Sequence, residues 1–333
     1  MNKTMFNDSV ILITGGTGSF GTKFVSMTLK KFNPRKLIVL SRDEIKQWDM
    51  SKTFEGDERI RFFIGDVRDK GRLHRALQGV DYVVHAAATK IVPTAEYNPF
   101  ECVKTNINGA MNLIDAAIDQ RVKKVVALST DKASSPVNLY GATKLASDKL
   151  FVASNYSYAN GQETSFSVVR YGNVMGSRGS IIPILVDKKT NQVSITDLNM
   201  TRFNITLNES IILVLDTIEK CEGGEIVIPK IPSYKLQTLV KALARNKKIK
   251  IIGVRKGEKL HEELLTKSES INALEAKDKF LLFSDTKKKT DILKKNYRFM
   301  KKITKEFSYN SRENKDYLTV QELKDLTKQE DLF

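Results

Sequence analysis

The 333-residue sequence has few cysteines, histidines, glycines and prolines. Its two cysteines, Cys102 and Cys221, and its three histidines lie far apart and match no disulfide or metal-ligand spacing. His261-Glu262-Glu263 lacks the second histidine that a zinc-protease helix needs. We therefore expect no metal site. The 18 glycines and 7 prolines form no linker-like stretch, so any two domains are expected to pack closely together.

Long hydrophobic runs are also missing. No run approaches the roughly 20 apolar residues that a membrane-spanning helix needs. The apolar stretch Val10–Ile13 is too short for the core of a signal peptide and continues into Gly15-Gly16. We expect a cytoplasmic protein with no membrane partner.

Acidic residues are outnumbered, with 39 Asp and Glu against 55 Lys and Arg, for a net charge of +16. Much of the excess lies in residues 241–260 and 281–310. A nucleic-acid surface would have such a charge, and so would a lysine-rich face exposed to solvent. No zinc-finger, RNA-recognition or helix-turn-helix motif accompanies it, so we expect no nucleic-acid partner. A small anionic substrate fits better.

Short apolar runs alternate with helical patterns over the first 170 residues, and the 41% hydrophobic content is enough for a core. Helices are expected at 20–31, 70–77, 139–154 and from Pro99 onward. Strands are expected between them, at 10–14, 37–40, 60–64, 82–85, 125–128 and 166–169. This alternation predicts an α/β fold with a doubly wound parallel sheet of the Rossmann type.

The pattern becomes irregular after Tyr171. We expect loops at 172–179 and 197–204, a strand at 225–228, and helices at 207–220 and 320–327. The predicted organisation is a Rossmann-type domain at 1–172, to which later segments return. Residues 173–333 are expected to form mainly a smaller substrate-binding α/β portion and a C-terminal tail.

A glycine-rich turn follows the first predicted strand. Gly15, Gly18 and Gly21 form a G-x-x-G-x-x-G pattern between a strand and a helix, where backbone N–H groups and the helix N-terminus receive a pyrophosphate. The residues between them that we assign to the cofactor site are Thr17, Ser19 and Phe20. After the third and fourth predicted strands, Asp66-Val67 is expected beside the adenine, and the small Ala86 and Ala87 allow the backbone to approach the cofactor.

The end of the second predicted strand bears on the choice of cofactor. Ser41 and Arg42 come first there, and Lys46 follows one helical turn later. A guanidinium at this place suits a 2′-phosphate, which favours NADP. The alternative is that Asp43 holds the ribose of NAD while Arg42 points to solvent.

The fifth predicted strand ends in Thr130-Asp131-Lys132, and Tyr140 and Lys144 follow four residues apart on one face of a helix. There the Lys144 ammonium and an oxidised nicotinamide are expected to lower the pKa of Tyr140 below its usual value of about 10. A tyrosinate can then accept a proton from a sugar hydroxyl.

With these motifs the chain resembles the extended short-chain dehydrogenase/reductases that act on nucleotide sugars. More narrowly, it resembles the configuration-inverting UDP-N-acetylglucosamine 4,6-dehydratases that open the pseudaminic acid pathway. The likeness runs nearly end to end. It rests on segments at 14–21, 40–46, 65–69, 85–99, 128–133, 138–149, 168–182, 200–203 and 257–263. Relatives often carry Met in place of Tyr140 in the retaining, membrane-anchored branch, so Tyr140 favours the inverting one.

The resemblance implies roles for further residues. Lys132 is the expected base for the C5 proton and Asp131 the expected acid for the C6 hydroxyl, although on composition alone an ion pair that caps the next helix would explain both. Guanidinium groups match phosphate oxygens, which suits Arg202 and Arg255 for the diphosphate. Glu258 is expected at the uridine ribose and Asn173 near the sugar diphosphate. The other implied contacts are Lys90, to both cofactor and substrate, and Thr105, to substrate. Asn204 and Lys256 depart from the Trp and Pro that the relatives usually have.

The implied reaction converts UDP-N-acetylglucosamine to UDP-2-acetamido-2,6-dideoxy-beta-L-arabino-hex-4-ulose with inversion at C5 and a cofactor that stays bound. A homo-oligomer, dimer or hexamer, is expected from the same resemblance. The alternatives are a UDP-sugar 4-epimerase, a nucleotide-sugar dehydratase of another branch, and a catalytically silent NADP-binding sensor.

Overall fold

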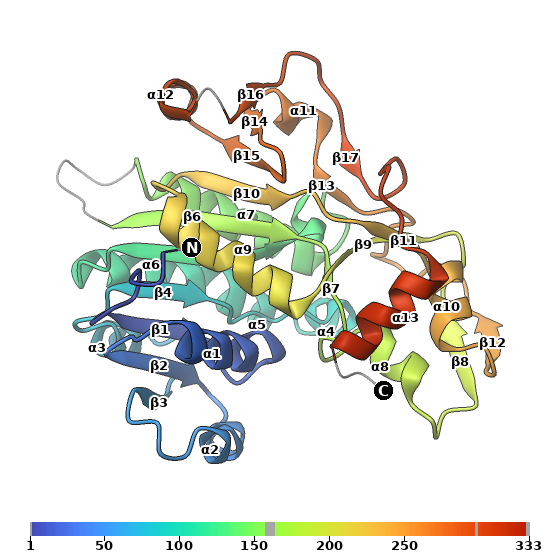
Figure 1. Ribbon diagram of the computed structural model, residues 1–333, viewed down its shortest axis with the longest axis horizontal. Helices are drawn as coiled ribbons and strands as arrows, with labels where there is room; N and C mark the ends of the chain where they lie inside the picture. The colour runs from blue at the N-terminus through green and yellow to red at the C-terminus, as the bar shows by residue number, and fades with distance from the viewer. Residues whose placement is uncertain (1, 157–163, 297–298, 331–333) are drawn as a thin grey trace.

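The computed structural model describes residues 2–156, 164–296 and 299–330. In this part of the chain ten strands form a central sheet (Figure 1), in the order β16-β14-β15-β10-β6-β5-β4-β1-β2-β3. Seven are parallel: β1 (Val10–Thr14), β2 (Lys36–Ser41), β3 (Ile60–Ile64), β4 (Tyr82–His85), β5 (Lys124–Thr130), β6 (Ser165–Tyr171) and β10 (Glu225–Pro229). The predicted doubly wound sheet is confirmed.

Three further strands extend this sheet in antiparallel pairing. They come from the second half of the chain: β15 (Lys279–Phe283), β14 (Ala273–Glu275) and β16 (Lys301–Lys302). Two short helices of that region are α11 (Lys267–Ser270) and α12 (Thr286–Asn296). Late segments of the chain therefore complete the sheet that the first half begins.

Helices connect the parallel strands. They are α1 (Ser19–Lys31), α2 (Glu44–Thr53), α3 (Lys70–Ala76), α4 (Val92–Tyr97), α5 (Pro99–Val103), α6 (Gly109–Asp119), α7 (Leu139–Ala153) and α9 (Leu207–Lys220). The long helix expected from Pro99 is interrupted by a π-helical turn, η1 (Lys104–Asn108), between α5 and α6. Buried strands such as Val10–Thr14 and amphipathic helices such as α9 pack into one large hydrophobic cluster.

A second, smaller hydrophobic cluster lies beside the sheet. It is built by α8 (Ile181–Val186), β8 (Gln192–Ile195), α10 (Leu236–Leu243) and α13 (Val320–Gln329), with β12 (Lys248–Ile251) paired to β8. Figure 1 shows these elements grouped at one end of the sheet. This arrangement matches the expected smaller α/β portion.

Short strands join the two regions. They are β7 (Asn173–Val174), β9 (Thr201–Ile205), β11 (Ser233–Lys235), β13 (Glu263–Leu265) and β17 (Tyr309–Asn310). The expectation of loops at 172–179 and 197–204 is wrong where β7 and β9 form. Strand β9 pairs with β7 and β11, and pairing with segments distant in the sequence leaves no local signal.

Candidate active site

The turn after β1 has the geometry that a pyrophosphate site requires. Gly15 has a φ of 64°, and a Cβ there would lie 2.9 Å from the backbone of Ala87. A Cβ on Gly21 would lie 2.3 Å from the Gly16 carbonyl oxygen, so α1 packs against the turn as only glycine allows. Helix α1 follows Gly18 without a side-chain cap, which leaves its N-terminus open to an anion. These residues fit a dinucleotide.

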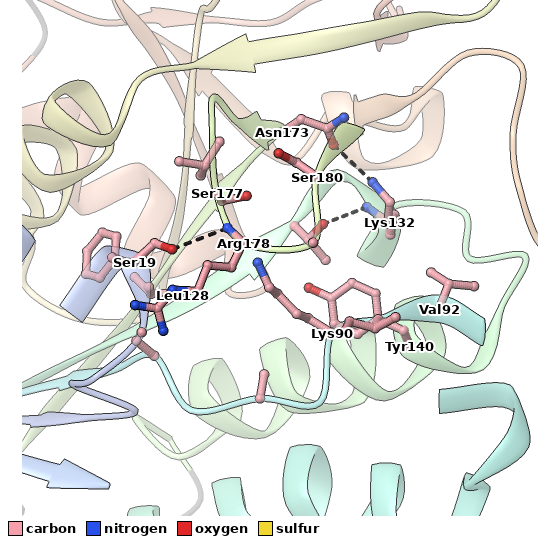
Figure 2. Close-up of a pocket in the computed structure, with 18 of the residues that line it drawn as sticks. Ser19, Lys90, Val92, Leu128, Lys132, Tyr140, Asn173, Ser177, Arg178 and Ser180 are labelled. Atoms are coloured by element: carbon pink, nitrogen blue, oxygen red, sulfur yellow. Dashed lines mark hydrogen bonds between the residues drawn. The ribbon is translucent and has the colours of Figure 1, made fainter. Parts of the chain in front are cut away.

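A cavity of about 810 Å³ extends from this turn to the C-terminal half of the chain. Every predicted site residue except Asp131 lines it. Those on the cofactor side are Gly15, Thr17, Gly18, Ser19, Phe20, Gly21, Ser41, Arg42, Lys46, Asp66, Val67, Ala86 and Ala87. The remainder are Lys90, Thr105, Thr130, Lys132, Tyr140, Lys144, Asn173, Arg202, Arg255 and Glu258. Figure 2 shows side chains from separate segments of the chain converging on this space.

The end of β2 places the residues that bear on NADP. The Ser41 hydroxyl lies 2.8 Å from that of Thr17. Asp43 caps α2 by accepting a hydrogen bond from the Lys46 backbone N–H at 3.0 Å, and its carboxylate lies 2.7 Å from Lys46 Nζ. Arg42 is 59% exposed, 3.7 Å from Asp66. The acid of this turn therefore has a structural role as a helix cap.

Tyr140 and Lys144 lie on one face of α7. Tyr140 is half-buried and hydrogen-bonds with Thr130, and Lys144 is buried and interacts with the charge of Asp148. Burial raises the pKa of Tyr140 to about 12, against the lowering effects of the Lys132 charge and a Thr130 hydrogen bond. The protein's own groups therefore raise this pKa overall. The expected lowering also needs the positive charge of an oxidised nicotinamide, and it stays a prediction. A buried phenolate loses its hydration, and burial also lowers the pKa of Lys144.

Lys132, which lines the cavity, forms an ion pair with Asp131, and Asp131 Oδ1 lies 3.0 Å from Lys132 Nζ. Asp131 is fully buried and does not line the cavity, and burial raises its pKa in spite of the neighbouring Lys132. Lys132 Nζ also lies 3.3 Å from Asn173 Oδ1 and 3.5 Å from Glu262 Oε1. Burial lowers the pKa of Lys132, but Asp131 and Glu262 outweigh it and raise that pKa overall.

The expected substrate residues Arg202, Arg255 and Glu258 come from the C-terminal half of the chain and line the same cavity as the glycine turn. Arg202 is held by the carbonyl oxygens of Thr201 and Leu260 at 2.8 and 3.1 Å. Arg255 is exposed and lies 3.9 Å from Glu258 Oε1. Burial and the charge of Lys132 lower the pKa of Lys90. The cavity therefore has cations along its length, as an anionic ligand requires.

The cavity also has lining residues that the sequence motifs did not identify. Ser177, Arg178 and Ser180 lie on a loop whose glycines, Gly176 and Gly179, have φ values of 67° and 82°. The Arg178 N–H donates to Ser19 Oγ at 3.3 Å (Figure 2). The two glycines were the available signal for this loop.

Glu262 and Lys259 complete the lining near Lys132. Both lie in the segment 257–263 that carries part of the family resemblance, but the resemblance implied no role for them, and only the fold brings them near Lys132. Over the described ranges, no three His, Cys, Asp or Glu side chains gather as a metal site would require. No helix there is long and apolar enough to span a bilayer.

Comparisons with known proteins agree with this geometry. Residues 11–283 match the family described as polysaccharide biosynthesis protein. A Campylobacter jejuni protein named UDP-N-acetylglucosamine 4,6-dehydratase (inverting) is 56% identical over 80% of each chain. A Rickettsia akari protein named UDP-glucose 4-epimerase is 44% identical over 81% of each chain.

One solved structure covers almost the whole fold. The X-ray structure of Pen from Bacillus thuringiensis has a TM-score of 0.90 and 40% identity, and it covers 98% of this chain and 99% of that one. These matches confirm the resemblance drawn from the motifs, and the chain belongs to the polysaccharide biosynthesis protein family of extended short-chain dehydrogenase/reductases.

Proposed function

We propose that the protein is an inverting 4,6-dehydratase of UDP-N-acetylglucosamine. The observation that carries the proposal is one cavity that joins a dinucleotide turn to Tyr140, Lys144 and Lys132, with Asp131 directly behind. The 56% identity to a protein of this name supports the same reaction. The product would be UDP-2-acetamido-2,6-dideoxy-beta-L-arabino-hex-4-ulose.

The chain's own residues supply the proton transfers. Tyr140 takes the C4 hydroxyl proton, with Lys144 and Thr130 orienting its phenol. Transfer of the Lys132 ammonium proton to Asp131 within their ion pair would leave a neutral amine that takes the C5 proton and a carboxylic acid that protonates the departing C6 hydroxyl. The glycine turn would hold NADP⁺, which would supply reversible hydride transfer, from C4 and back to C6, so that no net oxidation would result.

The cavity residues divide the substrate between them. Arg202 and Arg255 would bind the diphosphate, Glu258 the ribose, and Lys90, Thr105 and Asn173 the sugar side. The choice of NADP rests on Arg42 and Lys46 and on the capping role of Asp43. The division at residue 172 into a cofactor part and a mainly substrate-binding part belongs to the same proposal.

Proton NMR of the purified protein with UDP-N-acetylglucosamine in D₂O, without added cofactor, tests the function. We expect a new C6 methyl signal, deuterium at C5 and the L-arabino coupling pattern. A 6-deoxy product with the D-xylo configuration would identify a retaining enzyme. Unchanged substrate, with or without added NADP⁺, would refute the proposed activity.

A second candidate is a UDP-sugar 4-epimerase, because a relative with 44% identity bears that kind of name. An epimerase needs only the redox tyrosine, and Asp131 and Lys132 would then be a structural ion pair. The same NMR spectrum separates the two, since an epimerase gives a C4 epimer and no C6 methyl signal.

Assembly and location complete the proposal. We propose a homo-oligomer, dimer or hexamer, in support of which Tyr97 and Phe100 of α4 and α5 are 86% and 79% exposed. Sedimentation velocity tests this, and a monomer would contradict it. We also propose that the protein acts in the cytoplasm, in pseudaminic acid synthesis, because its proposed substrate is a nucleotide sugar. Deletion of the gene is then expected to abolish pseudaminic acid.

A further inference from the structure

A second carboxylate meets Lys132 from the side of the cavity. Glu262 Oε1 lies 3.5 Å from Lys132 Nζ and 3.8 Å from Arg202 Nε. Glu262 is 2% exposed yet lines the cavity, whereas Asp131 is buried away from it. Of the two acids beside Lys132, Glu262 is therefore the one that lines the cavity, and Asp131 contacts Lys132 from behind.

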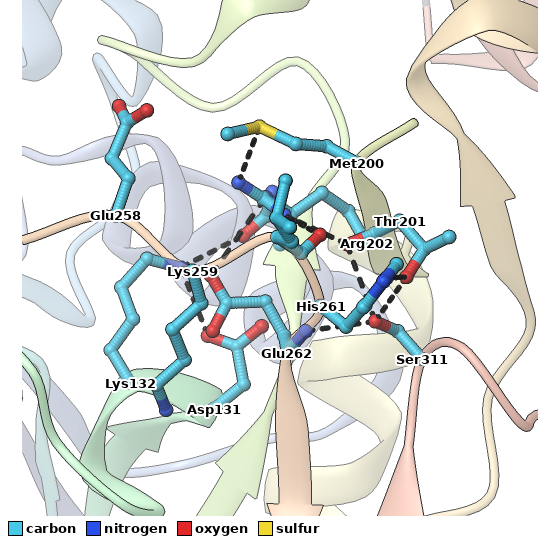
Figure 3. Close-up of polar contacts among 12 residues, drawn as sticks. Asp131, Lys132, Met200, Thr201, Arg202, Glu258, Lys259, His261, Glu262 and Ser311 are labelled. Atoms are coloured by element: carbon cyan, nitrogen blue, oxygen red, sulfur yellow. Dashed lines mark hydrogen bonds and ion pairs between the residues drawn. The ribbon is translucent and has the colours of Figure 1, made fainter. Parts of the chain in front are cut away.

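The backbone around Glu262 is fixed by a separate hydrogen-bond network (Figure 3). The Glu262 N–H donates to Ser311 Oγ at 2.9 Å, and the Ser311 N–H donates to the Glu262 carbonyl oxygen at 2.8 Å. The Thr201 hydroxyl lies 2.7 Å from Ser311 Oγ and 2.8 Å from His261 Nδ1. These hydrogen bonds join the Glu262 backbone and not its carboxylate. The network therefore fixes the position of Glu262, and the carboxylate pairs with Lys132 and Arg202.

The charges around Lys132 show what this position achieves. Asp131 and Glu262 face Lys132 with negative charge, while Arg202, Lys259 and Lys90 surround the group with positive charge. Burial raises the pKa of Glu262, but the charges of Lys132, Arg202 and Lys259 outweigh burial and hold this pKa below its usual value. Among the described residues, Glu262 Oε2 has no hydrogen-bond partner. An ionised, buried carboxylate without its full set of partners attracts a nearby ammonium strongly.

We propose that Glu262 is a positioning residue for Lys132, holding its ammonium at the cavity wall between two carboxylates and linking it to Arg202. The inference deepens the proposed function and rests on it. One carboxylate would then join the lysine that acts at C5 to the arginine that binds the diphosphate.

The first test measures Lys132 directly and needs no substrate. Reductive methylation modifies the neutral amine, and mass spectrometry reports the labelling rate of Lys132 at pH 9. Loss of an adjacent negative charge lowers a lysine pKa by about one unit or more, so Glu262→Gln is expected to label about tenfold faster than the wild type or more. Glu263→Gln is the matched control, because Glu263 binds Ser135 and Ser308 outside the cavity lining.

The second test follows catalysis. For Glu262→Gln we expect kcat to be about 10- to 100-fold lower, because Lys132 would be displaced from its reacting position. We also expect the limb of the kcat–pH profile that reports Lys132 to move to lower pH, because a neighbouring negative charge is lost. Glu262→Asp retains the charge and is expected to restore slow labelling and part of the kcat. The proposal would be overturned if Lys132 were labelled at the wild-type rate in Glu262→Gln, or if the Asp and Gln variants had equal labelling rates and kcat values. A change in KM without a change in kcat would also overturn it. Inactive wild-type protein would refute only the proposed function, because the labelling result stands without turnover.

Discussion

At the scale of single residues, Tyr140 shows what the protein leaves to its ligand. Burial raises the pKa of this phenol to about 12, so at neutral pH it stays protonated in the protein alone. A positive charge bound beside it would favour the phenolate and lower this pKa. The cofactor and the base are therefore expected to become active together.

We predict that Tyr140→Phe lowers kcat by about 10²- to 10⁴-fold, the usual contribution of a positioned acid–base group. The ultraviolet difference spectrum between wild type and Tyr140→Phe reports the phenolate. Protein freed of dinucleotide should show no Tyr140 phenolate at pH 10, and the signal should move to lower pH when the oxidised dinucleotide binds. A phenolate signal at pH 8 in the free protein would contradict this.

Arg42 is expected to select the cofactor. We predict that Arg42→Ala weakens NADP binding by about 10- to 100-fold, the loss expected for one charge-assisted hydrogen bond, and changes NAD binding only a few-fold. Isothermal titration calorimetry of both dinucleotides checks this. Arg61→Ala, on the neighbouring strand and outside the cavity lining, is the control. Equal losses for NAD and NADP would show that Arg42 does not read the 2′-phosphate.

At the scale of elements, the close packing of α1 on the glycine turn is the feature most sensitive to a single methyl group. We predict that Gly21→Ala abolishes dinucleotide binding and lowers Tm, because its Cβ would lie 2.3 Å from the Gly16 carbonyl oxygen. Gly71→Ala is the matched control. Its Cβ would meet only Asp69 Oδ1 at 3.5 Å within α3, so we expect stabilisation by about 0.5–1 kcal/mol. Scanning calorimetry and retained cofactor after purification separate the two variants.

The elements that local sequence predicts are those with a repeating pattern of their own. Strand β1 was predicted to the residue, and α9 likewise, because each carries its apolar face in consecutive or helically spaced residues. Strand β9 was missed because its partners come from distant parts of the chain. Glu262 was missed although it lies in the segment 257–263 that carries part of the family resemblance, because only tertiary packing brings its carboxylate to Lys132.

At the scale of the whole molecule, a buried charge network ties the catalytic helix to the C-terminal half. Arg170 of β6 is fully buried, with its guanidinium 3.4 Å from Asp148 of α7 and 3.0 Å from Glu269 of α11. Asp148 also accepts a hydrogen bond from Ser129 at 2.7 Å and interacts with the charge of Lys144. The position of α7, and with it Tyr140, therefore depends on segments more than a hundred residues later in the chain.

This network leads to a prediction for global stability. Arg170→Met keeps much of the side-chain volume but removes the guanidinium that pairs with buried Asp148 and half-buried Glu269. We expect this loss to cost about 3–5 kcal/mol in the free energy of unfolding. Arg35→Met is the control. It removes the exposed ion pair between Arg35 and Asp8, in which Nε lies 3.7 Å from Oδ1. We expect this loss to lower the free energy of unfolding by less than about 1 kcal/mol. Urea unfolding followed by circular dichroism measures both. If Arg170→Met were as stable as Arg35→Met, the buried charges around Arg170 would not hold α7 in place.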